Sequence, residues 1–144
     1  MILAAIAFPY FFGCANKAKQ SEGKQYLSSI NRAQQAYFAE TGAFSNSVKA
    51  LDLGIKTQTT NYNYSILATK NAAFNYAVSI RKTKDLTSYV GAVFLVPVSQ
   101  AANKEKTTVS ILCAANSPEN TQPPAPIFQN DVPVCAAGSS LVTK

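Results

Sequence analysis

The N-terminal segment constrains the fold more than any other part of the chain. Residues 2–13 carry no charged side chain, and Pro9 is the one strong helix disruptor among them. A helix needs about 20 apolar residues to span the hydrocarbon core of a bilayer, so this segment alone is too short to cross one. Either further apolar residues precede it, or it is buried in some other way.

Three interpretations of this segment are open. A secretory signal peptide requires a basic start, and no basic residue precedes Ile2. A lipoprotein signal is suggested by Gly13 followed by Cys14, which would make Cys14 a lipid acceptor, but the basic start is missing here too. In the third interpretation, residues 2–13 are the lower part of a longer helix, and Cys14 is a small packing residue.

The residues that follow favour the longer helix. Apolar side chains recur there at helical spacing and predict a face that packs on the rest of the fold: Tyr26, Leu27, Ile30, Ala33 and Tyr37. Gly42 supplies a helix stop, so one helix is expected from about Ile2 to Glu40, bent or locally opened at Pro9. A helix that is apolar all round at one end needs a bilayer or copies of itself to cover that end.

The remainder of the chain reads as a connection followed by strands. Residues 45–55 predict a short helix or turn, capped by Ser45 or Asn46, with three apolar contacts: Val48, Leu51 and Leu53. Strand-like runs follow at residues 62–68, 74–80, 88–99 and 108–114. The first two should each have one buried face, and the third should be central because it is apolar on both faces.

These elements predict an α+β fold, in which a long N-terminal helix packs on a roughly four-stranded antiparallel sheet. The expected divisions are a helix at 1–41, a connecting loop at 42–60 and a sheet with a C-terminal loop at 61–144.

Four tyrosines in the strands suggest either sheet core or a platform for bases or sugars, with core the favoured interpretation: Tyr62, Tyr64, Tyr76 and Tyr89.

Charge and composition weaken most catalytic interpretations. The chain has no histidine, which removes the commonest general base and metal ligand, and no nucleophile, base and orienting group can be named together. We therefore expect neither an enzyme nor a cofactor.

Most of the net charge of +6 falls on residues 41–110, where Arg81, Lys82 and Lys84 form the one basic run. This run is a candidate anion-binding surface, although a solvated hairpin end is favoured over a nucleic-acid contact.

Three cysteines are too widely spaced for a zinc site of paired CxxC motifs. Cys113 and Cys135 flank a loop rich in proline, asparagine and glutamine, and a bridge between them would staple that loop to the last strand. Two buried free thiols are the alternative.

The same loop carries oxygen ligands that could hold a hard cation such as Ca²⁺: Glu119, Asn120, Asn130 and Asp131. Two carboxylates without EF-hand spacing favour ordinary solvation instead, so no metal site is expected.

Several segments carry a resemblance to a known family. They are ILAAIAFP at residues 2–9, ANKAKQSE at 15–22, NRAQQAYFAETGAF at 31–44, LDLGI at 51–55 and YNYSI at 62–66. Together they resemble the type IV pilins, and in particular the pilin-like proteins of the G/H type. The resemblance is strong over residues 2–66 and architectural beyond them.

The resemblance implies a long helix with a sheet packed on its second half and a C-terminal loop closed by a disulfide, here Cys113 with Cys135. It also implies a precursor anchored in the inner membrane and extracted by assembly machinery into an extracellular filament of repeated copies. The residues it places in the filament core are Ile2, Leu3, Ile6, Phe8, Pro9, Phe11 and Phe12. Family members begin with a basic leader and further apolar residues that include a glutamate, which we expect before Met1.

The leading hypothesis is thus a structural subunit of a type IV pilus that exposes its head for adhesion, motility or DNA uptake. A pseudopilin of a type II secretion system would share the same helix and sheet but build a short piston. A lipid-anchored module, attached at Cys14 and binding glycans or DNA through the tyrosines and the basic run, comes from a different class. Nucleic acid is a weakly supported partner.

Overall fold

A computed structural model describes the backbone of residues 2–80, 85–98 and 105–143, and the side chains of these ranges from Asn16 onward. Helix α1 (Ile2–Thr41) is continuous through Pro9, where the sequence predicted a bend or an opening, and through Cys14. It ends as predicted, because Gly42 takes φ 79° and its N–H donates to the carbonyl of Phe38 over 2.8 Å. Within the described residues, no helix has both the length and the hydropathy needed to cross a bilayer.

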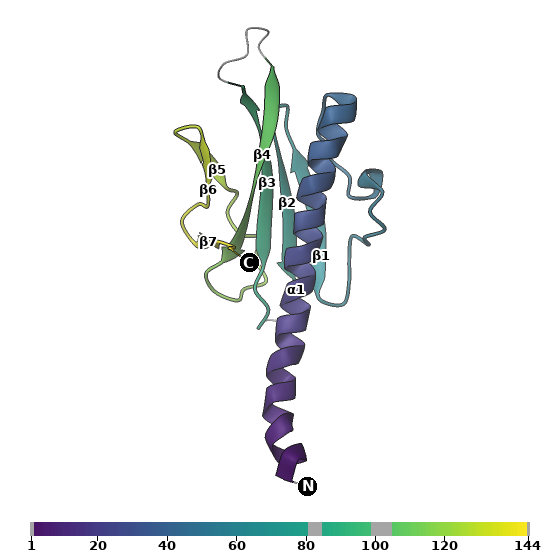
Figure 1. Cartoon of the computed structure of the whole chain (residues 1–144), viewed down its shortest axis with the longest axis vertical. Helices are drawn as coiled ribbons and strands as arrows, with labels where there is room; N and C mark the ends of the chain where they lie inside the picture. The colour runs from purple at the N-terminus through teal and green to yellow at the C-terminus, as the bar shows by residue number, and fades with distance from the viewer. Residues whose placement is uncertain (1, 81–84, 99–104, 144) are drawn as a thin grey trace.

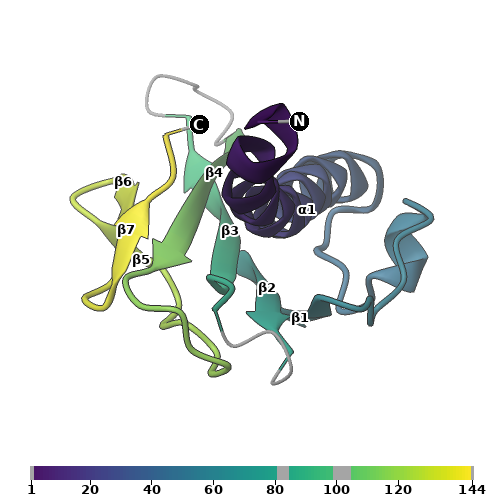
Figure 2. The ribbon, with the colours of Figure 1, turned by 90° about the horizontal axis from the view of Figure 1, so that it is seen from below.

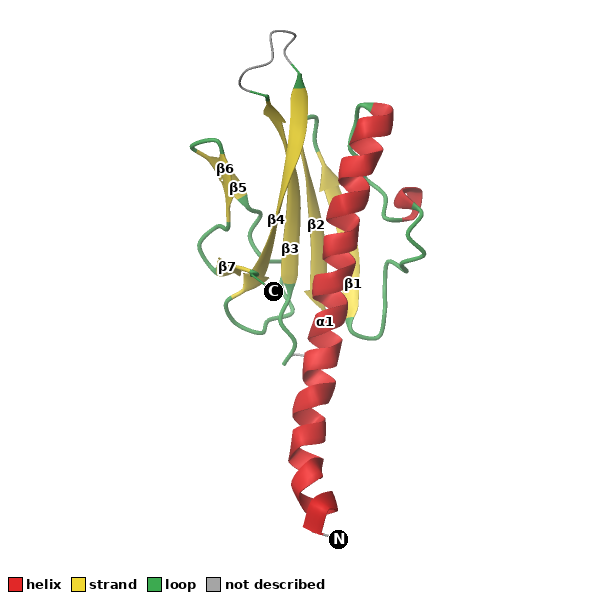
Figure 3. Ribbon diagram, in the orientation of Figure 1, coloured by secondary structure: helices red, strands yellow, loops and turns green. Residues whose placement is uncertain are grey.

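Five antiparallel strands form the main sheet (Figures 1 and 3). They are β1 (Tyr62–Ala68), β2 (Ala72–Ser79), β3 (Tyr89–Pro97), β4 (Lys106–Ala115) and β7 (Ser139–Leu141), in the spatial order β1-β2-β3-β4-β7. The first four are the meander that the sequence predicts, with β3 at the centre. The fifth strand was missed, because β7 has three residues and pairs only with the last three of β4.

Helix α1 lies along one face of this sheet (Figure 2). Leu27 and Ile30 are completely buried there, and Tyr26, Ala33 and Tyr37 pack against the same core. The sheet contributes the alternating side chains of β1 and β2 that point toward the helix, together with the first residue of β3: Tyr62, Tyr64, Ala77 and Tyr89. The predicted single buried face is confirmed for β1, whose buried and exposed residues alternate at its start.

The opposite face of the sheet is also covered, which corrects the prediction for β2. Tyr76 of β2 lies in a second core with Phe94 and Cys113, while Ala73 and Ala77 of the same strand are buried on the helix side. The C-terminal segment supplies this cover: β5 (Ile127–Gln129) and β6 (Val132–Val134) form a separate hairpin. Phe128 of this hairpin stacks obliquely on Phe94, with ring centroids 5.4 Å apart.

The connection between α1 and β1 contains a short 3₁₀-helix, η1 (Lys49–Leu51), as the sequence predicts. Its packing differs in part, since Val48 and Leu51 are buried but Leu53 is 36% exposed. The predicted caps are wrong. Val48 occupies the N-cap position, and Ser47 Oγ accepts the N–H of Ala50. The hydroxyl of Ser45 accepts the N–H of Ser47, and Asn46 Oδ1 accepts the N–H of Ala68.

Candidate functional site

The lower half of α1 leaves the head and projects away from the sheet (Figure 1). Residues 16–19 are exposed, and burial against the sheet begins at Gly23 and Leu27. The seven residues predicted for a filament core, between Ile2 and Phe12, all lie on the projecting part, of which the structure describes the backbone. The backbone of the apolar end of α1 thus lies outside the head.

Glu22 anchors the helix at the point where it leaves the head. Its Oε2 accepts hydrogen bonds from Tyr64 Oη over 2.6 Å and from Thr59 Oγ1 over 2.7 Å, and its Oε1 accepts one from Asn61 Nδ2 over 3.1 Å. Burial, and next the hydrogen bond to Glu22, raise the pKa of Tyr64 well above its usual value. One carboxylate therefore ties α1 to β1 and to the loop before it.

Gly23 lets the helix approach the sheet closely at the same level. A Cβ at this position would lie 2.9 Å from the ring of Tyr62 and 3.0 Å from that of Tyr89. Tyr62 is fully buried and donates its hydroxyl to the carbonyl of Thr87 over 2.7 Å. Burial also raises the pKa of Tyr62 and Tyr89.

The four strand tyrosines belong to the sheet core and do not form a platform for bases or sugars. Tyr62, Tyr64, Tyr76 and Tyr89 are each at most 4% exposed, so none of their rings is available to stack on a base or a sugar. The glycan- or DNA-binding platform is wrong for these residues.

A chain of polar side chains runs through the interface between helix and sheet. Asn31 Nδ2 donates to the carbonyl of Ile111 over 3.0 Å, and Asn31 Oδ1 accepts from Asn75 Nδ2 over 2.7 Å. Gln34 Nε2 donates to Asn75 Oδ1 over 3.5 Å and to the carbonyl of Ser45 over 2.7 Å, and Gln34 Oε1 accepts the N–H of Ser45. Directional hydrogen bonds therefore position α1 on the sheet, in addition to the burial of apolar side chains.

Sequence reasoning missed these polar residues. Asn31 and Gln34 lie one turn beyond Leu27 and Ile30 on the same helix face, and that placement is the signal that could have identified them.

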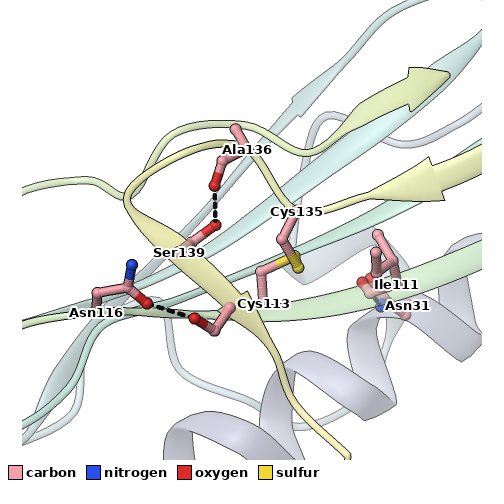
Figure 4. The surroundings of a disulfide bond; sticks show 8 residues. Asn31, Ile111, Cys113, Asn116, Cys135, Ala136 and Ser139 are labelled. Carbon is pink, nitrogen blue, oxygen red and sulfur yellow. Dashed lines mark hydrogen bonds between the residues drawn. A yellow bond between two sulfur atoms is a disulfide. The ribbon is translucent and has the colours of Figure 1, made fainter.

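A disulfide joins Cys113 to Cys135 and fastens the C-terminal segment to the outer face of β4 (Figure 4). The two Cα atoms are 5.8 Å apart and the S–S bond is 2.02 Å long, so the predicted bridge is confirmed. Ser139 Oγ donates to the carbonyl of Ala136 over 2.9 Å, next to the bridge.

The start of the C-terminal segment is fastened separately. Ser88 Oγ donates to the carbonyl of Glu119 and Ser79 Oγ donates to Asn120 Oδ1, each over 2.9 Å. The segment thus lies against the sheet at both of its ends.

The model of the family described as type IV pilin-like G and H matches residues 20–136, which is most of the chain. The chain belongs to this pilin-like family. The match begins within α1 and continues through β3 and β4 into the C-terminal segment, beyond the residues whose resemblance to pilins is strongest. No curated protein and no solved structure matches the chain.

The calcium ligands considered for this pilin-like chain have other roles. Asn120 Oδ1 is occupied by Ser79, while Asn130 and Asp131, with φ of 54° and 61°, form the turn between β5 and β6. In the part of the chain that the structure describes, no three histidine, cysteine or acidic side chains gather into a metal site. The basic run of Arg81, Lys82 and Lys84 lies outside the described residues.

Proposed function

We propose that this pilin-like chain is a structural subunit of an extracellular type IV pilus. The observation that carries the proposal is the helix that projects from the head: α1 has 40 residues, and its burial against the sheet begins only near Gly23. The uncharged residues 2–13 lie on the projecting half. Family membership supports the same function, and the family is not known for enzymatic activity.

Assembly would follow from the burial of this apolar segment. Apolar surface left in water is unfavourable at roughly 25 cal/mol per Å², so parallel copies would pack this segment into a common core. The residues in that core would be Ile2, Leu3, Ile6, Phe8, Pro9, Phe11 and Phe12. A contact between two different surfaces of the same subunit repeats without closing and produces a helical fibre.

Before assembly the same segment would hold the subunit in the inner membrane, together with the residues that pilins carry ahead of it. Assembly machinery would then extract the subunit into the filament. In the filament the sheet and its C-terminal segment would face outward, because they lie beside and behind α1 in the head (Figure 2). Contacts for adhesion, motility or DNA uptake would come from this outer surface.

Electron microscopy of cells with and without the gene tests the proposal. Cells lacking the gene should lose a class of pili, and restoring the wild-type gene should restore them. Ile6→Lys should fail to restore pili because it places a charge in the apolar core. Leu67→Lys should restore them, since Leu67 is 56% exposed on the head.

Other results would assign a different function. Unchanged pili together with a loss of protein secretion would identify a pseudopilin of a type II secretion system. Palmitate found on Cys14 would support a lipid-anchored module, although α1 runs without interruption through Cys14.

A further inference from the structure

A basic groove runs along one flank of α1, between the helix and the C-terminal end of the sheet. It has a volume of about 580 Å³, and its walls include Lys24 and Arg32 of α1, Leu112 of β4 and Val142. Leu141, which is 59% exposed, lines the hollow that adjoins it. The groove thus combines two cationic side chains with exposed aliphatic surface.

An acidic groove lies on the other flank of the same helix, between its C-terminal half and η1. It has a volume of about 450 Å³, and Tyr37 and Leu51 form part of its wall. Its charged residues are Glu40 and Asp52, and Leu53 beside them is 36% exposed. This groove therefore has the opposite charge and the same aliphatic character.

The charges of both grooves are available for a partner. Among the described residues, the side chains of Lys24, Arg32, Glu40 and Asp52 have neither a hydrogen bond nor an ion-pair partner. Glu40 also stands in the last turn of α1, where the partial negative charge of the helix end adds to its own. A cationic surface would relieve this repulsion.

We infer that the basic groove of one subunit docks onto the acidic groove of a second copy, and that this is a lateral contact of the filament. The inference rests on the proposed function and adds the surfaces through which neighbouring heads meet. Opposite charges select the second copy in this orientation. Two basic grooves, or two acidic ones, would repel each other, so the contact is heterologous and does not close into a symmetric dimer.

The spacing of the charges along α1 sets the offset between neighbours. Lys24, Arg32 and Glu40 follow one another at intervals of eight residues. Eight residues of α-helix rise about 12 Å, so a parallel neighbour displaced by about that distance brings Arg32 beside Glu40. Lys24 is brought by the same shift toward the level of η1, which carries Asp52 at its end.

Reversing the charges tests the contact in filaments of the full chain. Arg32→Glu and Glu40→Lys should each reduce the number of filaments per cell at least tenfold, and the double variant should restore them. Lys70→Glu is the matched control, because Lys70 is exposed in the turn between β1 and β2, away from both grooves. The Cys113–Cys135 bond, measured by alkylation, reports in each variant that the head has folded.

The pair Lys24→Glu and Asp52→Lys repeats the test at independent positions, with the same loss and restoration expected. Filaments that persist in every single variant would overturn the inference while leaving the proposed function intact. Loss of filaments in the single variants without recovery in either double variant would also overturn the inference, because the two residues of each pair would then not contact each other. If wild-type cells make no filament that depends on the gene, the proposed function itself fails.

Discussion

The contact between Asn31 and Gly91 gives the sharpest test of how the helix is held on the sheet. Gly91 lies in β3 between Asn75 of β2 and Leu112 of β4, and the side chain of Asn31 lies directly over it. A Cβ at position 91 would be 2.7 Å from Asn31 Oδ1 and 3.0 Å from Asn31 Nδ2. Gly91→Ala therefore requires either the strand or the amide to move.

The strand cannot move easily, because β3 is paired on both sides along this stretch. The amide must shift instead, which breaks its bonds to Ile111 and Asn75 inside a buried interface. Each buried group left without a partner costs about 1–3 kcal/mol. Two broken bonds therefore cost about 2–6 kcal/mol. Alanine recovers about 0.4–1 kcal/mol by restricting the unfolded chain, so the net loss should be about 1–5.6 kcal/mol.

Urea unfolding of the full chain in mild detergent measures this loss. Gly54→Ala is a suitable control, since Gly54 has φ 70° with no atom near its Cβ position and should lose only about 1 kcal/mol through backbone strain. In an Asn31→Ala background, Gly91→Ala should cost little or nothing. A neutral Gly91→Ala variant, or the same cost in both backgrounds, would refute the steric argument.

Three further predictions concern the disulfide and the Glu22 anchor. Reduction of the Cys113–Cys135 bridge, whose cysteines are 22 residues apart, should lower the free energy of unfolding by about 3 kcal/mol. In limited proteolysis the reduced form should be cleaved first in the C-terminal segment. Equal cleavage rates of the oxidised and reduced forms would contradict this. Glu22→Gln should cost about 1–3 kcal/mol because an amide nitrogen replaces an oxygen that accepts two hydroxyl protons, whereas Glu40→Gln, at the exposed helix end, should be close to neutral in the same urea titration. Stability should fall as pH rises above about 10, because the folded state keeps the Tyr64 proton that the unfolded chain loses there; the expected slope is about 1.4 kcal/mol per pH unit for each such tyrosine, and Tyr64→Phe should make it shallower. An unchanged slope in Tyr64→Phe would show that Tyr64 ionises normally in the folded state.

The long elements were predictable because their periodicity is uninterrupted. Tyr62, Tyr64 and Ile66 occupy alternate positions of β1, and Leu27 and Ile30 recur at helical spacing in α1. In β2 the alternation misled, since Phe74 and Tyr76 mark the outer face while small residues form the face that receives the helix. Small side chains let α1 come close, but they give no hydrophobic signal in the sequence.

The parts that were missed depend on tertiary context. Strand β7 is too short to show alternation, and its pairing depends on the bridge that brings the C-terminus back to β4. Asn31 and Gln34 are polar residues on a buried helix face, and only the facing carbonyl and amide groups explain them. Their network fixes the rotation and height of α1 on the sheet, which apolar contacts alone specify weakly.

A filament subunit needs this rigidity, because any freedom between helix and head would disorder the repeat. The anchors are spread along α1: Glu22 near the point of exit, Asn31 in the middle and Gln34 beyond it. Together they hold the projecting segment in a fixed direction relative to the two grooves. In the proposed filament, a defined offset between neighbouring subunits would depend on that direction.

Helical reconstruction of filaments sheared from cells would show whether this chain forms a pilus. We expect a fibre built from this chain, with residues 2–13 of parallel α1 helices in its core and the disulfide-bound C-terminal segment on its surface. We also expect an offset of about 12 Å between the neighbours that share the two grooves. Filaments built entirely of another protein, and unchanged in number when the gene is deleted, would contradict the proposed function.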